Sequence, residues 1–243
     1  MSQKRKYKIL ICASYFLPGF RAGGPIKSIK NICQYANQDA EFFVLTRNYD
    51  VKKTDSYDLP INTWTKKKYF KIKYIKSFFF YFFSLKKDLE EIKPDLIYAN
   101  SFFDIFLYLH YIFYFSFSSK KNIPILIAPR GEFSPGAKKI KKIRKFLYLK
   151  LVNFFPLYRN IFFHATSDYE KTLINKNIKQ LSAISSAGGI IKNDVLVAEN
   201  IPNFNDTPKK SIQSFKDEMN ICFISRISKM KNLPFALDVL KHV

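Results

Sequence analysis

The stretch KILICASYFLPGFRAGGPIKSI, residues 8–29, contains the pattern that decides the fold. Its first six residues, Lys8–Ala13, form a short and largely apolar run, which predicts a strand. Gly23 and Gly24 close the loop that follows, and apolar residues then recur at helical spacing over Pro25–Ala36. The stretch therefore predicts a strand, a glycine turn and a helix, which is a typical opening of an α/β domain.

The rest of the chain repeats this alternation of strand-like and helix-like segments. Further strands are predicted at Glu41–Thr46, Asp95–Ala99, Ile123–Ala128, Ile161–Ala165 and Val195–Ala198. Helices are predicted at Ser77–Glu91 and Phe102–Phe117, and further ones begin after the capping residues Ser134 and Ser167. Between residues 48 and 74 the chain is polar and irregular, which predicts a loop with short strands. The alternation predicts a parallel, doubly wound sheet.

A second strand-to-helix junction lies near the end of the sequence, in NICFISRISKMKN at residues 220–232. The apolar run Ile221–Ile224 predicts a buried strand, and a helix is predicted over Leu233–His242. Arg226 and Lys231 lie in the turn between them. Because a helix N-terminus adds unpaired N–H groups and a positive dipole end, two cations at this point are well placed to hold a phosphate.

Polar residues follow the predicted strands at five points, and ligands of open α/β sheets bind beyond the carboxyl ends of the strands. The five points are Gly23–Gly24, Asn100–Ser101, Arg130–Gly131, Thr166–Ser167 and Arg226. We expect them to line one cationic crevice. An arginine beside a glycine suits a carboxylate or phosphate, with a surface salt bridge as the alternative. His164 lies inside a strand, which favours a hydrogen-bonded core histidine over a catalytic one.

The composition is strongly basic. The 243 residues include 41 Lys and Arg against 19 Asp and Glu, which gives a formal net charge of +22. This imbalance indicates an anionic partner, either nucleic acid, an acidic membrane surface or a phosphorylated substrate, unless it reflects a general compositional bias. The sequence contains no RRM, KH or other nucleic-acid-binding motif, so no nucleic-acid partner is expected.

The predicted helix at residues 136–154 concentrates lysines around an apolar stripe. This pattern fits either docking on anionic lipid or an ordinary solvated helix face. The apolar segment Phe102–Phe117 is shorter than the roughly 20 residues of a spanning helix, and Asp104 and His110 interrupt it. Three scattered cysteines without a Cys-x-x-Cys pair support neither a zinc site nor a disulfide framework. We expect a cytoplasmic protein, with peripheral attachment to the inner face of the membrane left open.

Four segments occur in an order that resembles family 4-like glycosyltransferases of the GT-B fold. They are LPGFRAGGPIKSI (17–29), APRGEFSPGAKKIKKIRKFLYLKL (128–151), FFHATSDYEKTLI (162–174) and FISRISKMKNLPFALDVL (223–240). The resemblance implies a Rossmann-like, acceptor-side domain at residues 1–200. Residues 201–243 would then be a linker and the first strand and helix of a second Rossmann-like domain. That donor-binding domain would be truncated, because the family's paired glutamates would lie beyond Val243.

The resemblance also implies a function: transfer of a sugar from a nucleotide-sugar donor to a glycan or lipid-linked acceptor in surface polysaccharide biosynthesis. Such enzymes retain the anomeric configuration without a metal or other cofactor, and no general base can be assigned here. Arg226 and Lys231 would hold the donor diphosphate, which Gly23 and Gly24 would face. The acceptor side would comprise Arg130, Gly131, Ser101 and Ser167. The alternatives are a catalytically incomplete fragment or split half, and a basic nucleic-acid-binding protein suggested by charge alone.

Overall fold

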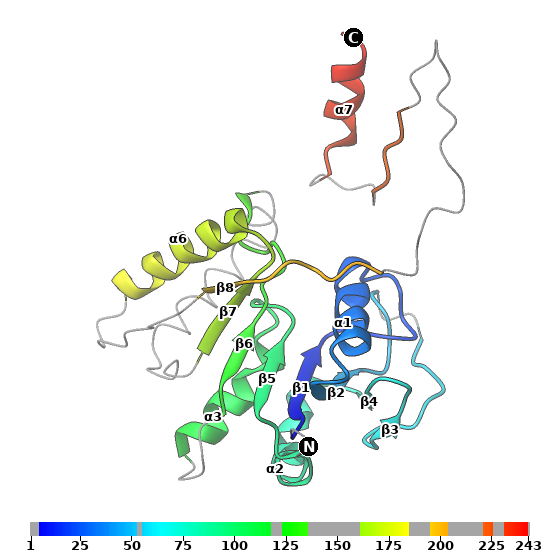
Figure 1. The fold of residues 1–243 in the computed structure, drawn as a ribbon, viewed down its shortest axis with the longest axis vertical. Helices are drawn as coiled ribbons and strands as arrows, with labels where there is room; N and C mark the ends of the chain where they lie inside the picture. Colours follow the sequence, from blue (N-terminus) through cyan, green and yellow to red (C-terminus); the bar gives the residue numbers. More distant parts are fainter. Residues whose placement is uncertain are drawn as a thin grey trace. The chain divides into compact units, whose positions relative to one another are not determined.

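The computed structural model describes residues 5–52, 55–117, 123–135, 161–184, 195–203, 221–225 and 231–242 (Figure 1). The chain divides into two compact units, Met1–Pro202 and Asn203–Val243. Arg226 and the predicted basic helix at residues 136–154 lie outside the described residues, so their roles stay predictions.

The first unit is an α/β domain, as the alternation of segments predicted. Its described strands are β1 (Tyr7–Ala13), β2 (Ala40–Arg47), β3 (Thr65–Lys66), β4 (Lys71–Ile75), β5 (Leu96–Ala99), β6 (Ile125–Ile127), β7 (Ile161–Ala165) and β8 (Val195–Val197). Its described helices are α1 (Gly24–Tyr35), α2 (Phe78–Ile92), the 3-10 helix η1 (Ile105–Leu107), α3 (Leu109–Phe117) and α6 (Asp168–Ile184).

The strands form one sheet in the order β3-β4-β2-β1-β5-β6-β7-β8. Every neighbouring pair is parallel except β3 and β4, which are antiparallel. The chain first moves outward from β1 to β2 and then returns to place β5 on the other side of β1. The prediction of a parallel, doubly wound sheet is confirmed for the order and direction of the strands. The strand order reverses between β1 and β5.

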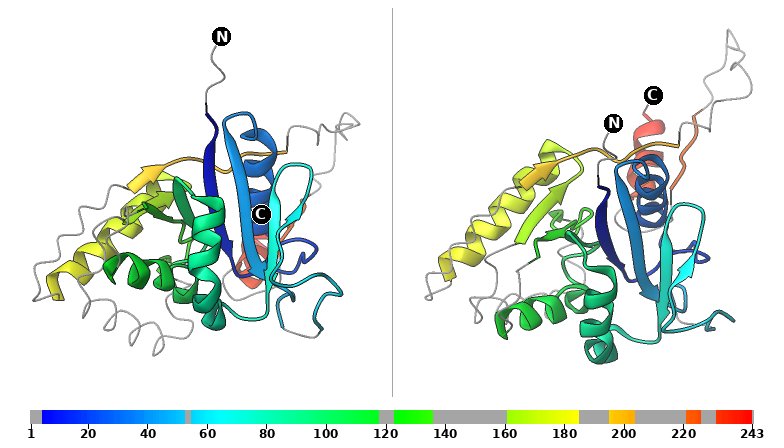
Figure 2. Two further views of the ribbon diagram at one scale, coloured as in Figure 1. Left: turned by 90° about the horizontal axis from the view of Figure 1, so that it is seen from below. Right: turned by 60° about the horizontal axis from the view of Figure 1, so that its bottom comes forward.

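The sheet has an apolar core on each face, because its central strands are continuous hydrophobic runs. Aligned residues Phe43, Leu10, Ile97, Ile125 and Ile161 form a buried row across five strands. That row packs with buried residues of α2, α3 and α6. The alternate residues, such as Ile11 and Val44, pack with Ile26, Ile29 and Cys33 of α1. Figure 2 shows α1 on one side of the sheet and α2 and α3 on the other.

One predicted helix of this unit was wrong in its extent. We expected a continuous helix over Phe102–Phe117, but a short 3-10 helix precedes an α-helix that begins at Leu109. The backbone N–H groups of Phe102 and Phe103 donate to the carboxylate of Glu132, at 2.7 and 3.2 Å. The first N–H groups of a helix have no acceptor within it, so these bonds fix the loop and do not block a helix. The carbonyl oxygen of Phe102, which a helix would pair with the N–H group four residues later, accepts from the Tyr108 hydroxyl at 2.6 Å.

The described part of the second unit contains one helix, α7 (Leu233–Leu240), close to the predicted position. The strand predicted at Ile221–Ile224 is absent: these residues have no strand conformation, and Ile224 is 92% exposed. A strand needs a neighbour to pair its backbone groups, and the described residues of this unit include none. Among the described residues of the whole chain, no helix is long and apolar enough to cross a membrane.

Candidate functional site

The carboxyl edge of the sheet carries most of the residues that the sequence singled out. Ser14 follows β1, Asn100 and Ser101 follow β5, Arg130 lies beyond β6, and Thr166 follows β7. Four of the five predicted strand ends therefore lie along one edge. The fifth, at Arg226, lies outside the described residues and belongs to the second unit, as does the exposed Lys231.

Gly23 and Gly24 form the turn that opens α1. Gly23 has a φ of 71° and a ψ of −127°, a conformation that side-chain-bearing residues rarely adopt. A Cβ atom placed on either glycine would meet no atom within 4 Å. The helix that begins here has no side-chain cap at its N-terminus. The Gly23 N–H donates to the carbonyl oxygen of Phe20 at 3.0 Å and Pro25 has no N–H, so an anionic ligand in this open space would approach the Gly24 N–H at the positive end of the helix.

Asp50, three residues after the end of β2, fixes the loop that leads to this turn. Its carboxylate accepts hydrogen bonds from the backbone N–H groups of Phe20, Arg21 and Val51, at 3.0, 3.1 and 2.7 Å. Burial would raise the pKa of Asp50, but these backbone bonds and the charge of Arg21 outweigh it, so the pKa lies below its usual value. The glycine loop is thus fixed by a charged acceptor thirty residues away, together with a hydrogen bond from the Gly23 N–H to the carbonyl oxygen of Phe20 at 3.0 Å.

Arg130 lies in the left-handed region, with a φ of 52°, and its side chain is held by three oxygen atoms. Its Nε donates to Asn100 at 2.9 Å, one terminal nitrogen to Asn200 at 2.6 Å, and the other to Tyr98 at 2.8 Å. All three acceptors are uncharged groups of the chain itself. Arg130 therefore orders the loops at this edge, because each of its guanidinium nitrogens already donates to an oxygen atom of the chain.

Tyr98 and His164 continue the hydrogen bonds of Arg130 toward the interior of the domain. The Tyr98 hydroxyl lies 2.8 Å from Nδ1 of His164, whose Nε2 lies 2.8 Å from the carbonyl oxygen of Ala198. Burial raises the pKa of Tyr98 to about 12 and lowers the pKa of His164. Both groups are therefore neutral at pH 7. The prediction of a hydrogen-bonded core histidine is confirmed, because both ring nitrogens have partners.

Glu170 joins the ends of β6 and β7. Its carboxylate accepts from the backbone of Gly131 at 2.6 Å and from both the backbone and hydroxyl of Thr166 at 2.7 Å. These bonds, with the charge of Arg130, outweigh the effect of burial and lower the pKa of Glu170. Ser167 accepts from the backbone N–H of Glu170 at 3.2 Å and so caps α6. Gly131 and Ser167, both predicted site residues, thus take part in local structure.

Two further carboxylates, which the sequence analysis did not single out, lie at the switch point. Glu132 accepts from the Ser101 hydroxyl at 2.7 Å and fixes the loop after β5. Asp104 accepts from the Ser14 hydroxyl and forms a 2.9 Å ion pair with Arg47. Each acidic residue follows the end of a strand within a few positions, which is the signal that could have identified it. Ser14, Arg47 and Asp104 bring the ends of β1, β2 and β5 together.

A hollow of about 310 Å³ lies at the other edge of the sheet, between the amino end of β2 and the β3–β4 hairpin. Lysines, including Lys66, Lys67 and Lys68, line it. Because ligands of open α/β sheets bind at the carboxyl edge, this hollow is not the candidate site.

The described residues contain no group of His, Cys, Asp and Glu side chains that could hold a metal ion. The chain matches no family model and no curated protein.

Proposed function

We propose that the chain binds a nucleotide sugar at the carboxyl edge of its sheet and serves in transfer of the sugar to a glycan or lipid-linked acceptor. The observation that carries this proposal is the Gly23–Gly24 turn, with open space before an uncapped helix at the end of β1. The sequence supports the proposal through four segments, which occur in an order that resembles GT-B glycosyltransferases.

The chemical task would be to bind and stabilise the donor diphosphate, which gains charge as it leaves the sugar. The backbone at Gly23 and Gly24 can approach phosphate oxygens closely because neither residue has a side chain. Asp50 holds the loop before them, so little conformational entropy is lost when a ligand binds. On the resemblance, Arg226 and Lys231 would supply the opposing cations in a retaining, metal-independent reaction of surface polysaccharide synthesis.

The acceptor would lie along the ends of β5, β6 and β7. There we propose Ser101 and Asn100 as polar neighbours of the acceptor, with Arg130 as a positioning residue. All three guanidinium nitrogens of Arg130 already donate, to Asn100, Asn200 and Tyr98. In this proposal Gly131 and Ser167 act through Glu170, which ties the two loops together.

Calorimetry of the full chain with UDP and GDP sugars tests the proposal. Wild-type chain should bind at least one of these donors, and Gly24→Ala should lose most of that affinity because a methyl group would occupy the space needed by the phosphates. The same variant should fold normally, since the added methyl meets no atom within 4 Å. Lys30→Gln, on the exposed surface of α1, is the matched control and should bind like wild type.

Arg226→Ala provides a second arm of the same experiment. It removes a positive charge, whereas Gly24→Ala fills space in the proposed site. The proposal requires that this variant also lose donor affinity. If Gly24→Ala and Arg226→Ala both fold and bind nucleotide sugars as wild type does, the proposed donor site is wrong.

A second candidate is a catalytically incomplete half that acts only with a partner chain. The observation that favours it is the surface of α7, on which no residue is buried and Phe235, Leu237 and Val239 are exposed. A partner that completes the second unit would cover these side chains. Tight binding of a nucleotide sugar by this chain alone would count against this candidate, while binding only after addition of a separate donor-domain chain would support it.

A further inference from the structure

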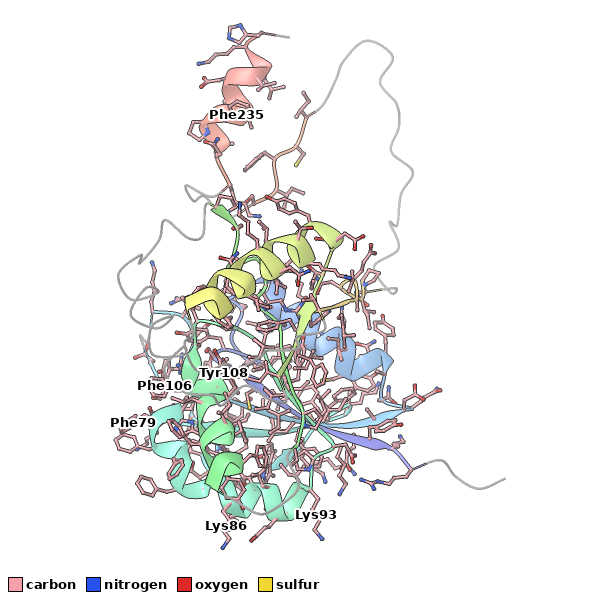
Figure 3. The ribbon with its side chains drawn as sticks, turned by 90° about the vertical axis from the view of Figure 1, so that its left-hand side faces the viewer. Phe79, Lys86, Lys93, Phe106, Tyr108 and Phe235 are labelled. Atoms are coloured by element: carbon pink, nitrogen blue, oxygen red, sulfur yellow. The ribbon has the colours of Figure 1, made fainter. Side chains whose placement is uncertain are left out.

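Five phenylalanines form an exposed surface beside the carboxyl edge of the sheet, which we call the aromatic face. Four lie in the first two turns of α2 and one in η1, and their exposed fractions run from 38% to 84%. They are Phe79, Phe80, Phe82, Phe83 and Phe106. Figure 3 shows Phe79 and Phe106 at the outer margin of the molecule.

The pattern of α2 explains why these side chains are exposed. The helix packs on the sheet through Phe78, Tyr81, Leu85, Leu89 and Ile92, which recur at helical spacing on one side. An ordinary surface helix would carry polar residues on the opposite side, and α2 does so only in its second half, at Lys86, Lys87, Glu90 and Glu91. Its first six residues are all aromatic, and only Phe78 and Tyr81 among them are buried, so the other phenylalanines are not needed for the core.

The rings touch one another and form a continuous surface. The ring centroids of Phe79 lie 5.2 Å from Phe80 and 6.0 Å from Phe106. His110 lies between Phe106 and Phe82, at 6.0 and 5.9 Å, and Phe82 lies 6.1 Å from Phe83. With ~150–250 Å² for each whole aromatic side chain, the five expose on the order of 500 Å². The largest apolar patch on a typical folded monomer has about this size and often serves in binding.

Lysines surround the aromatic face. Lys86 and Lys87 lie one turn beyond Phe82 and Phe83 on the same side of the helix, and Figure 3 shows Lys86 and Lys93 projecting further along it. Lys76 is exposed just before the helix. Asp88 is buried and paired with Lys73, so it does not neutralise this surface. The exposed Glu90 and Glu91 lie one turn beyond Lys86 and Lys87, further from the phenylalanines, and the four exposed lysines outnumber these two glutamates. Together with the net charge of +22, the lysines make the rim of the aromatic face positive.

We propose that the aromatic face docks the protein on an anionic phospholipid membrane, with the phenylalanines inserted among the acyl chains and the lysines on lipid phosphates. Aromatic side chains next to basic residues on one helix face are the arrangement that such a surface requires. The proposal rests on α2 and η1 and holds independently of the donor site. It also differs from docking through residues 136–154.

A second copy of the chain is the less suitable occupant. Self-association through this face would bring Lys86 and Lys87 of two molecules together, and each molecule carries a formal charge of +22. An anionic bilayer instead supplies a counter-charge to every lysine and an apolar layer to every phenylalanine.

The aromatic face also adjoins the switch point. Phe78, the first residue of α2, packs under the guanidinium group of Arg47 at 5.5 Å, and Arg47 is paired with Asp104. Docking through the neighbouring residues would thus hold the carboxyl edge of the sheet close to the lipid headgroups. A lipid-linked acceptor could then reach that edge without leaving the membrane.

Co-sedimentation of the full chain with vesicles tests the proposal. Wild-type protein should bind vesicles of equal phosphatidylglycerol and phosphatidylcholine far more tightly than phosphatidylcholine alone. Phe80→Ser/Phe83→Ser should weaken binding to the anionic vesicles by at least tenfold, since each buried phenylalanine contributes strongly to insertion. Tyr169→Ser, a similarly exposed aromatic on α6, is the matched control and should bind like wild type.

A variant that removes charge separates the insertion of phenylalanines into the membrane from the electrostatic attraction of lysines to the lipid phosphates. It also tests the proposal if the aromatic variant does not fold. Lys86→Gln/Lys87→Gln should weaken binding to anionic vesicles by about fivefold for each lysine and leave the weak binding to neutral vesicles unchanged. Circular dichroism would confirm that each variant is folded. Wild-type protein that ignores anionic vesicles, or folded variants that bind as it does, would overturn the proposal. So would light scattering that shows a stable dimer abolished by Phe80→Ser/Phe83→Ser without vesicle binding.

Discussion

The Tyr98 hydroxyl donates a hydrogen bond to Nδ1 of His164 across 2.8 Å, and the other ring nitrogen sets its direction. Nε2 lies 2.8 Å from the carbonyl oxygen of Ala198, which can only accept, so Nε2 carries the proton and Nδ1 accepts. Tyr98 in turn accepts from Arg130 at 2.8 Å. Every donor in this chain of bonds has one acceptor, and the arrangement holds only while His164 is neutral.

This requirement predicts a pH dependence of stability. Burial, with the charge of Arg130, lowers the pKa of His164, against the opposing effects of the Ala198 carbonyl and Glu170. An unfolded histidine binds its proton near pH ~6.5, so below that pH the unfolded state holds more protons than the folded one. The free energy of unfolding should therefore fall as the pH drops from 7.5 to 5.5, and it should be fully regained above the unfolded pKa.

Thermal unfolding of His164→Gln across the same range checks this prediction. Glutamine can still donate to the Ala198 carbonyl but cannot take up a proton, so its melting temperature should fall less with acid than that of wild type. His110, whose pKa burial also lowers, should account for a remaining slope. Parallel curves for the two proteins would mean that His164 binds its proton equally well in the folded and unfolded chain.

Arg130 should also order the segment that follows β8. That segment runs from the sheet edge toward α1 (Figure 1), where the side chain of Asn31 donates to the carbonyl oxygen of Ile201 at 2.8 Å. Asn200 accepts from Arg130 at 2.6 Å. Asn200→Ala should therefore increase amide exchange of Ala198 about five- to tenfold, because a charge-assisted hydrogen bond at the surface is lost.

Hydrogen exchange followed by NMR or mass spectrometry measures this effect. Glu199→Ala is the matched control, since Glu199 is the exposed neighbour of Asn200 and should leave the exchange of Ala198 unchanged. Equal exchange in Asn200→Ala and wild type would show that the β7–β8 pairing alone protects this amide.

The strands of the first unit were predictable because buried parallel strands are continuous apolar runs, and Lys8–Ala13 and Ile161–Ala165 show this clearly. The rule that ligands bind at carboxyl ends then located Arg130 and Ser101 at one edge. Their partners were not predictable, because Asn200 and Glu132 lie 70 and 31 residues away along the chain. Nothing local in a sequence states which distant carboxylate will meet a given hydroxyl or backbone N–H group.

The wrong predictions share a cause. The Phe102–Phe117 helix starts late because contacts from Glu132 and Tyr108 hold its first residues in a loop. For Ile221–Ile224, the described residues of the second unit include no strand that could pair with it. In both segments a local pattern was judged without its neighbours in space. The aromatic face, in contrast, could have been found from the sequence, because the helical spacing of the buried residues from Phe78 to Ile92 leaves Phe79 and Phe83 outside the buried side of α2.

The buried ion pair of Lys73 and Asp88 should be sensitive to loss of either partner. Their side chains are only 5% and 1% exposed, and the ammonium group lies 2.8 and 2.9 Å from the two carboxylate oxygens. Trp64 and Tyr81 also donate to Asp88. Asp88→Leu would leave Lys73 buried without a counter-charge, which we expect to cost about 3–5 kcal/mol of unfolding free energy.

Urea denaturation measures this cost. Lys73→Met/Asp88→Leu should recover part of the loss, because the uncompensated charge is removed. Lys71→Gln, on the same strand, is the control: its 2.9 Å pair with Glu41 is about 40% exposed, so its loss should cost less than about 1 kcal/mol. A double variant less stable than Asp88→Leu would contradict this account.

The two glycines before α1 should respond differently to the same substitution. Gly23→Ala forces a methyl-bearing residue into a φ of 71° and a ψ of −127°, which should cost about 1–3 kcal/mol. Gly24→Ala meets no atom within 4 Å and has no positive φ, so it should be neutral or stabilise the fold by about 0.5 kcal/mol. Thermal or urea unfolding of the two variants side by side measures the difference. Equal losses of stability would place the strain on the loop as a whole rather than on Gly23, and the use of Gly24→Ala as a probe of the donor site would then fail.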